Sequence, residues 1–392
     1  MALLLRNAQV WDGDAGDLVE SDVRCAYGYV TGLLPPGSDR PASDDEVVEM
    51  DGAALLPGLI DGHVHLVWDS SADPAAATAA AGEQRTVLRA AEFAWRHLIS
   101  GVTTVVDLGS NWDAAITVAE AVRDGDIVGP HVVAAGRTVA MTGGHDPFWV
   151  NPCDGVDAII RGVREQVFLG ARIIKTAATG GVYGQRHGEE VGASELTFDE
   201  LAALACEARR RGVPTAAHAL GTEGISNAVQ AGINVIEHGV FLTEEIVANM
   251  VERGTALCPT LAVYQTIAAG SAPGYAVEKA KDVVKAHQQS VELAIAAGVP
   301  IIAGTDAGSP GMPHPILEQE LGALLDAGMA PVDVLKAATS RAADALGLNA
   351  GRIAEGLPAD FVCVDGDPLT DPTLATEAWG VVRAGNLLRD DR

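Results

Sequence analysis

The stretch LLPGLIDGHVHL, residues 55–66, decides the fold, because an apolar run ends in two histidines one residue apart. Side chains at positions i and i+2 of a β-strand point to the same face, so His63 and His65 can face one point. At the C-terminal end of a buried strand, such a pair can bind one metal ion through neutral ring nitrogens. A hydrogen-bonded structural pair explains the motif about equally well, so its meaning depends on polar residues elsewhere in the chain.

After the histidine pair, short β-branched apolar runs alternate with longer helical stretches, as is typical of βαβ units with parallel strands. Strands are predicted at 59–65, 102–107, 131–135, 172–177, 213–218, 233–238, 255–260 and 299–306. Helices are predicted at 83–99, 113–123, 156–169, 197–211, 243–253 and 278–297. Eight strands close a barrel, so we predict an α/β fold with a (β/α)8 TIM barrel over residues 57–347.

Both ends of the chain depart from this pattern. Residues 1–56 contain short apolar runs broken by Asp-Gly and Pro-Pro-Gly turns, and residues 348–392 return to runs such as FVCV at 361–364. We predict that the two ends meet in one small flanking β-sandwich domain beside the barrel.

Composition narrows the function classes. The formal net charge of -27 repels phosphate backbones and argues against a nucleic-acid partner. No apolar run reaches the roughly 18 residues that span a bilayer, and residues 1–6 lack the features of a signal peptide, so we expect a cytoplasmic protein without a membrane partner. Apolar residues on outer helices favour a homo-oligomer, although helices buried within one chain give the same pattern.

The cysteines give no sign of a zinc knuckle or a redox pair, because they are scattered and odd in number. We expect all five to be reduced, buried small hydrophobes. They are Cys25, Cys153, Cys206, Cys258 and Cys363.

Polar residues fall at the predicted C-terminal ends of the strands, where barrels hold their active sites. They are His63, His65, Lys175, His218, His238 and Asp306. Each has a structural explanation alone; Asp306, for example, can cap the following helix. Six such residues on one rim favour a functional site.

Lys175 is the most informative of the six, because an ammonium beside four histidines in an apolar barrel mouth is costly and repels a cation. Burial can neutralise the amine by deprotonation, as in Schiff-base lysines. Alternatively, the amine can react with carbon dioxide to give a carbamate that bridges two metals. The residues alone leave both possibilities open.

The motif PGLIDGHVH at 57–65, followed in order by the lysine, the two later histidines and the aspartate, resembles the amidohydrolase superfamily of metal-dependent hydrolases on a (β/α)8 barrel. The motifs MTGGH at 141–145, KTAATGGV at 175–182 and IEHG at 236–239 resemble the imidazolonepropionase-like branch. Within that branch the likeness is to Xaa-Pro dipeptidases (prolidases) and aryl-amide hydrolases. The run GRIAEGLPAD at 351–360 is similar to the family's return into its β-sandwich.

The resemblance implies a binuclear centre with two divalent ions, of which zinc is the expected one, while manganese or cobalt also suits the ligand types. One ion would be held by His63, His65 and Asp306, the other by His218 and His238, with a carboxylated Lys175 bridging both. A metal-bridging hydroxide would attack a polarised carbonyl of a small-molecule amide or peptide, with Asp306 as the proton shuttle.

His145 is placed to bind the developing oxyanion or a substrate carboxylate, although an ordinary loop histidine beside two glycines is the alternative. Tyr183, Tyr264 and His187, or its neighbour Arg186, are further substrate-binding candidates. Trp68, Trp112 and Trp149 follow three successive strands and can either wall an apolar pocket or pack in the core. Asp107 ends a strand and has a structural role.

We therefore predict a hydrolase of amide C–N bonds that acts on dipeptides, Xaa-Pro peptides or N-acyl or aryl amides. The alternative enzyme is a cyclic-amide hydrolase or a deaminase on the same scaffold. Lys175 argues against a mononuclear deaminase, which has no need of it. A catalytically inactive metal-binding protein is the remaining class, and the presence of all six ligands argues against it.

Overall fold

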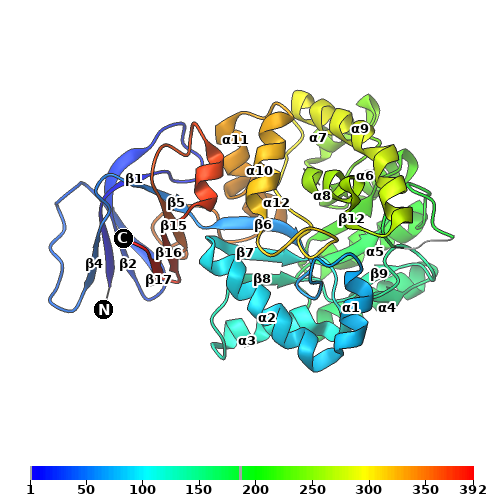
Figure 1. Ribbon diagram of the computed structural model, residues 1–392, viewed down its shortest axis with the longest axis horizontal. Helices are drawn as coiled ribbons and strands as arrows, with labels where there is room; N and C mark the ends of the chain where they lie inside the picture. Colours follow the sequence, from blue (N-terminus) through cyan, green and yellow to red (C-terminus); the bar gives the residue numbers. More distant parts are fainter. Residues whose placement is uncertain (1, 185–187) are drawn as a thin grey trace.

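The structure, a computed structural model, describes residues 2–184 and 188–392. Strands from both ends of the chain form one sheet, in the order β17-β16-β15-β5-β1-β2-β3, with β4 also paired to β1. Their bounds are β1 Leu3–Val10, β2 Val19–Ala26, β3 Tyr29–Leu34, β4 Glu46–Glu49, β5 Ala54–Pro57, β15 Phe361–Val364, β16 Gly380–Arg383 and β17 Asn386–Asp390. Figure 1 shows this terminal sheet at one end of the molecule, with both chain termini on it.

The terminal sheet is mostly antiparallel and packs an apolar face. Leu3, Leu5, Val23 and Phe361 are at most 2% exposed and belong to one cluster. The pairing of β5 with β15 joins the two ends of the chain, because Leu55 lies opposite Cys363 in the ladder. Strands from the two ends of the chain therefore share one sheet.

Parallel strands carry the rest of the fold. One sheet holds β6 Leu59–Val64, β7 Val102–Asp107 and β8 His131–Ala134. The other holds β9 Thr138–Ala140, β10 Val150–Pro152, β11 Ile174–Ala177, β12 Thr215–Ala219, β13 Val235–His238 and β14 Ala256–Cys258, in the order β10-β9-β11-β12-β13-β14. Seven of the eight predicted strands correspond to strands of these two sheets.

The predicted eighth strand, 299–306, is not a regular strand. It makes isolated bridges, Ile301 to Leu257 of β14, while Ala307 just beyond it bridges Val64 of β6. The segment packs closely at Gly304, because a Cβ there would lie 2.4 Å from Cys258 Sγ and 2.9 Å from His63 Cβ. The segment therefore fits between β14 and β6 by close backbone approach and irregular pairing.

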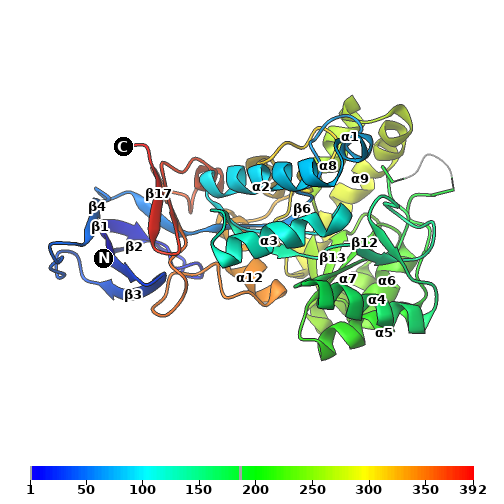
Figure 2. The ribbon, with the colours of Figure 1, turned by 90° about the horizontal axis from the view of Figure 1, so that it is seen from below.

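Helices follow most of these strands and surround them in both views of Figures 1 and 2. Their bounds are α1 Pro74–Ala81, α2 Glu83–Ile99, α3 Ala114–Asp124, α4 Val156–Leu169, α5 Phe198–Arg210, α6 Thr222–Ala231, α7 Glu244–Arg253, α8 Leu261–Thr266, α9 Gly274–Ala297, α10 Leu317–Asp326, α11 Pro331–Ala337 and α12 Ser340–Leu346, with short turns at Asn111–Asp113, Ile267–Ser271 and Pro372–Thr376.

Capping residues in the sequence explain where several of these helices begin and end. A capping box starts α5, where Thr197 and Glu200 each bind the other's backbone N–H. Gly170 and Gly298, both at positive φ, end α4 and α9. The six predicted helices agree with α2, α3, α4, α5, α7 and α9 within a few residues, whereas α1, α6, α8 and α10–α12 were not predicted.

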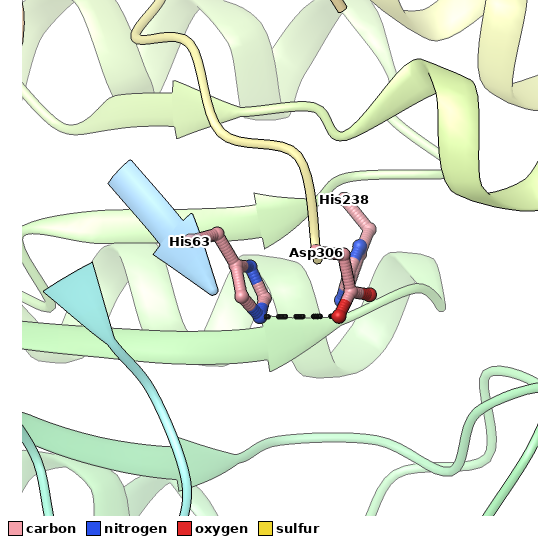
Figure 3. Close-up of side chains that lie close together, drawn as sticks. All are labelled: His63, His238 and Asp306. Carbon is pink, nitrogen blue, oxygen red and sulfur yellow. Dashed lines mark ion pairs between the residues drawn. The ribbon is translucent and has the colours of Figure 1, made fainter. Parts of the chain in front are cut away.

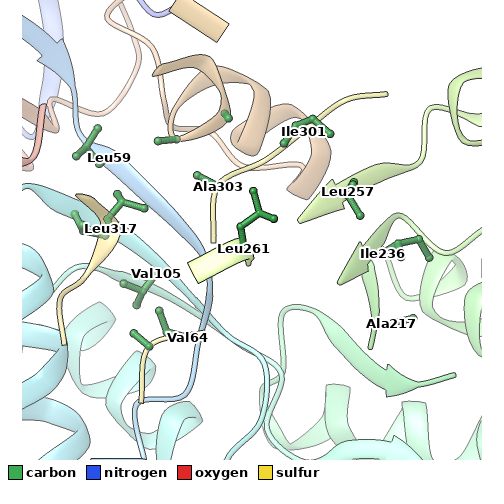
Figure 4. Close-up of a cluster of buried hydrophobic side chains, with 14 of the residues drawn as sticks. Leu59, Val64, Val105, Ala217, Ile236, Leu257, Leu261, Ile301, Ala303 and Leu317 are labelled. Carbon is green, nitrogen blue, oxygen red and sulfur yellow. The ribbon is translucent and has the colours of Figure 1, made fainter. Parts of the chain in front are cut away.

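The main core lies between the parallel strands and the helices. Figure 4 shows Val64, Val105, Ile236 and Leu257 from four strands, together with Leu317 from α10. These side chains are at most 2% exposed. This core holds the ends of the strands in place, and those ends carry the predicted site.

The cysteines differ from expectation at one position. All five are free, and four are buried, but Cys206 is exposed on the outer face of the amphipathic helix α5. Within residues 2–184 and 188–392, no helix combines the length and apolar character needed to cross a bilayer.

Candidate active site

A cavity opens where the parallel strands end. All six residues predicted at the strand ends line it, as do His145, Tyr183 and Tyr264. The structure therefore brings together residues that span more than 240 positions of the chain. His187 and Arg186 lie outside the described residues.

The first group of side chains comes from β6, β13 and the segment after residue 301. His63 Nε2 lies 3.9 Å from Asp306 Oδ1, and His65 Nε2 lies 3.4 Å from the same oxygen. Ligand atoms of His63, His238 and Asp306 all lie within 4.8 Å of one another, and Figure 3 shows the three side chains converging. The centroids of the His63 and His65 rings are 5.2 Å apart, so the two rings are neighbours, as the i, i+2 spacing predicts.

Left-handed backbone turns aim several of these side chains. His238 has φ 71°, Thr260 has φ 49° and Asp306 has φ 58°, although none of them is glycine. Such conformations cost about 1–3 kcal/mol each and persist where the surrounding structure holds them. At His238 the turn breaks the strand alternation, so Glu237 and His238 both reach toward His63.

Hydrogen bonds fix the orientation of the histidines. His63 Nδ1 contacts Glu237 Oε2 at 2.7 Å, and His65 Nδ1 donates to the Gly109 carbonyl at 3.2 Å. His238 Nδ1 lies 2.6 Å from Thr260 Oγ1, whose hydroxyl donates to the Pro259 carbonyl. With Nδ1 engaged as the donor, each ring presents the lone pair of Nε2 to the cavity.

These residues fit divalent metal ions. His218 Nε2 is buried and has no hydrogen-bond partner among the described residues, a costly arrangement unless a ligand takes its lone pair. Burial lowers the pKa values of His63, His218 and His238 well below the usual range, which keeps the rings neutral. Neutral imidazoles and a carboxylate are the donor set that zinc and related ions prefer.

Lys175 is buried, with 5% of its surface exposed, and lines the same cavity. Burial lowers the pKa of its ammonium, while the nearby carboxylates of Glu237 and Asp306 act in the opposite direction. The amine therefore deprotonates more readily than that of an exposed lysine, as its reaction with carbon dioxide or a carbonyl requires.

The ring of His145 stacks on the ring of His218, and the two ring centroids are 3.7 Å apart. Its Nδ1 is 2.5 Å from Glu189 Oε1, and its Nε2 is 3.2 Å from Asp146 Oδ2. Burial disfavours the imidazolium, but these two carboxylates outweigh burial and raise the pKa of His145 well above its usual value. His145 is thus a cation held between two anions.

Aromatic rings form the cavity wall. Trp149 stacks on His65 with ring centroids 4.7 Å apart, and Trp68 packs against Trp149 at 4.4 Å. The Tyr183 hydroxyl donates to Asp73 Oδ1 at 2.8 Å, and Tyr264 packs against His238. Trp112, in contrast, is not among the residues that line this cavity, because it lies in the turn Asn111–Asp113.

Supporting residues were missed from the sequence. Ser309 Oγ donates to Asp306 Oδ1 at 2.8 Å, and Asp61 accepts hydrogen bonds from Thr305 and from the His63 backbone. Glu237 stands inside a quoted motif, but strict strand alternation would have pointed it away from the site. Asp107 accepts the backbone N–H groups of Leu66 and Gly109, so its structural role is confirmed.

The fold and this cluster agree with a match to the amidohydrolase family model over residues 54–387. The chain belongs to the amidohydrolase family, whose members are hydrolases acting on carbon–nitrogen bonds.

Among individual proteins, the chain is 30% identical over 363 residues to ochratoxinase of Aspergillus niger, covering 83% of this chain and 74% of that protein. It is similar to a crystal structure of an amidohydrolase, with a TM-score of 0.91, 30% identity, and 100% and 99% of the two chains covered. It is also similar to a crystal structure of a Xaa-Pro dipeptidase with bound methionine in the active site, with a TM-score of 0.90, 27% identity, and 99% and 100% covered.

Proposed function

We propose that this protein is a binuclear metal-dependent hydrolase that cleaves the amide C–N bond of a dipeptide, an Xaa-Pro peptide or an N-acyl or aryl amide. The observation that carries the proposal is the convergence of four neutral histidines, Asp306 and buried Lys175 on one cavity. The relatedness to a Xaa-Pro dipeptidase and to ochratoxinase supports the amide class.

In this proposal His63, His65 and Asp306 would hold one ion, His218 and His238 would hold the other, and Lys175, if carboxylated, would be a ligand of both. When bound, two divalent ions, which we propose are zinc, lower the pKa of water toward neutrality and polarise the scissile carbonyl.

The chain's own residues supply positioning and proton transfer. Asp306 keeps one oxygen on Ser309 and its second carboxylate oxygen remains available to take a proton and pass it to the leaving nitrogen. His145 contributes a positive charge that favours negative charge on the carbonyl oxygen through space, because both of its ring nitrogens face carboxylates. Trp68, Trp149, Tyr183 and Tyr264 exclude water and contact the substituents of the substrate.

We further propose that the parallel strands form a (β/α)8 barrel over residues 57–347 and that residues 1–56 and 348–392 form a β-sandwich domain beside it. Hydrogen bonds link the strands of the two parallel sheets: Arg172 N donates to the Ala134 carbonyl, Gly62 N to the Ala303 carbonyl and Ile302 N to the Leu257 carbonyl. These bonds support a closed arrangement around the cavity.

The test combines metal analysis with a substrate panel. Purified protein should contain about two divalent ions per chain and hydrolyse members of a set of dipeptides, N-acyl amino acids and aryl amides faster than lactams. Lys175→Ala should lose most of the bound metal and reduce kcat/KM by about 10³-fold, because the bridge between the ions is removed. Lys336→Ala, at a lysine outside the cavity, is the matched control and should leave both unchanged.

Unchanged turnover in Lys175→Ala would contradict the binuclear proposal. Faster hydrolysis of lactams, or deamination of a nucleobase, would contradict the proposal of linear amide substrates and favour the alternative function. Two bound ions without any turnover would indicate a metal-binding protein.

A further inference from the structure

We propose that Asp146 binds a positively charged amino group of the substrate, so that the preferred substrates are amides whose acyl side is an amino acid with a free α-amino group. This inference rests on the proposed amide hydrolysis and names the substrate class of the same cavity.

Asp146 directly follows His145 in the loop between β9 and β10 and lines the cavity together with the proposed metal ligands. Its side chain is 15% exposed, so most of the carboxylate is removed from water. Asp146 also has φ 48°, a left-handed conformation that is sparsely populated for a residue with a side chain. Strain of this kind at a cavity wall is typical of a residue held in place for function.

One oxygen of this carboxylate has no partner. Oδ2 faces His145 Nε2 at 3.2 Å, but Oδ1 is buried and accepts no hydrogen bond from any described residue. A buried acceptor that stays unpaired costs about 1–3 kcal/mol, and more when it is charged. A donor group on the substrate removes this cost, which makes Oδ1 a preformed acceptor in the cavity.

The surroundings favour a cationic donor over an anionic ligand. Both ring nitrogens of His145 already face carboxylates, so this imidazolium has no free N–H for a substrate carboxylate at this position. Besides Asp146, two carboxyl groups surround His145: Glu189, which faces the ring, and Glu195, which accepts the His145 backbone N–H at 2.9 Å. Coulomb attraction in a cavity shielded from water therefore acts on an ammonium.

The position of Asp146 also suits an α-amino group. The turn that contains Asp146 continues to Trp149, whose backbone N–H contacts the Asp146 carbonyl and whose ring stacks on His65. The carboxylate therefore lines the same cavity as the residues proposed to hold the metal ions. In an amino acid amide only one carbon separates the amino nitrogen from the scissile carbonyl.

The test uses matched substrate pairs that differ only in the charge of the amino group: leucine p-nitroanilide and its N-acetyl derivative, and Phe-Pro and N-acetyl-Phe-Pro. The wild-type enzyme should prefer the free amine in each pair. Asp146→Asn should lower kcat/KM for the free amines by about 10–100-fold, because a hydrogen bond to a charged group contributes about 1.5–3 kcal/mol. The same variant should change kcat/KM for the acetylated partners by less than about 3-fold.

Asp154→Asn serves as the matched control, because Asp154 carries the same charge near the same loop but binds Thr142 outside the cavity. It should leave the preference for the free amine unchanged. Calorimetry adds a readout that needs no turnover: leucinamide should bind the wild-type protein more tightly than N-acetyl-leucinamide, and Asp146→Asn should remove the difference.

Equal losses for both members of a pair would overturn the inference and leave the proposed hydrolase intact, because Asp146 would then act only through His145. A wild-type preference for the acetylated members would also overturn it. If no amide in the panel is hydrolysed, the proposed function fails, and equal binding of leucinamide and N-acetyl-leucinamide then rejects the role of Asp146 as well.

Discussion

The terminal sheet and the cavity show two different uses of buried space. In the terminal sheet the buried cluster is apolar, with Leu5, Val23 and Phe361 at 0% exposure. In the cavity, His63, Lys175 and His238 are at most 5% exposed as well, yet they are polar. Apolar burial stabilises a fold by about 25 cal/mol per Å², whereas burial of polar groups costs free energy unless each finds a partner. The molecule thus separates the region that supplies stability from the region that supplies chemistry.

The largest effect should come from the apolar region. Phe361→Ala should lower the free energy of unfolding by about 3–5 kcal/mol, because it leaves a cavity in the terminal sheet. Urea denaturation measures this change. Activity per folded molecule should stay near the wild-type value, since Phe361 does not line the cavity. Tyr27→Ala, at a side chain that is 96% exposed, is the control and should change stability by less than about 0.5 kcal/mol.

The second prediction concerns the polar cavity, where a substitution should weaken metal binding and leave stability nearly unchanged. Glu237→Gln should weaken metal binding by about 10–100-fold, because the Glu237 carboxylate orients the His63 ring by contacting His63 Nδ1. Burial raises the pKa of Glu237 to about 7, so the neutral amide should change the stability of the metal-free protein by less than about 1 kcal/mol. Metal titration and urea denaturation separate the two results. A large loss of stability with normal metal affinity would show that Glu237 is structural.

The smallest effect lies on the outside of α5, where a carboxylate is paired with cations. Glu207 contacts Arg164, Arg210 and Arg211 at 2.8–3.1 Å, and the hydrogen bond from Arg164 is the main cause that lowers the pKa of Glu207 to about 2. A lowered carboxyl pKa stabilises the fold above the unfolded value of about 4.5, and this contribution disappears as pH falls toward 2. The arginines are about half exposed, so solvent reduces the contribution to about 1 kcal/mol.

Glu207→Gln should therefore be less stable than the wild type at pH 7 and equally stable near pH 2, as measured by thermal unfolding across this range. Glu120→Gln, at an exposed carboxylate on α3, should show no such dependence. A pH-independent difference would mean that Glu207 acts through packing.

Much of the cavity could be predicted because its residues stand at the ends of regular strands. His63 and His65 follow from the i, i+2 rule, and the βα periodicity placed Lys175, His218 and His238 at one edge before any contact was known. The bounds of α4 agree with the helix predicted at 156–169 from its apolar spacing, and glycines at positive φ, Gly155 and Gly170, flank it in the structure.

The remaining features depend on conformations that a periodic pattern does not contain. The left-handed turn at His238 brings Glu237 to His63, and that at Asp146 places its carboxylate in the cavity, yet neither residue type demands positive φ. The segment 299–306 pairs irregularly and packs closely at Gly304, and Cys206 lies on the exposed face of α5. In each case tertiary packing overrides local preference.

The ladder between β5 and β15 also governs the order in which the polypeptide can mature. Leu55 and Cys363 are partners although about three hundred residues separate them in the chain, so the terminal sheet cannot be completed during synthesis until the ribosome has released β15. The parallel strands leave the ribosome earlier and have time to associate while β5 still presents an unpaired edge. A nascent chain that stalls before residue 361 therefore leaves one edge of β5 without its partner strand and open to pairing with another chain.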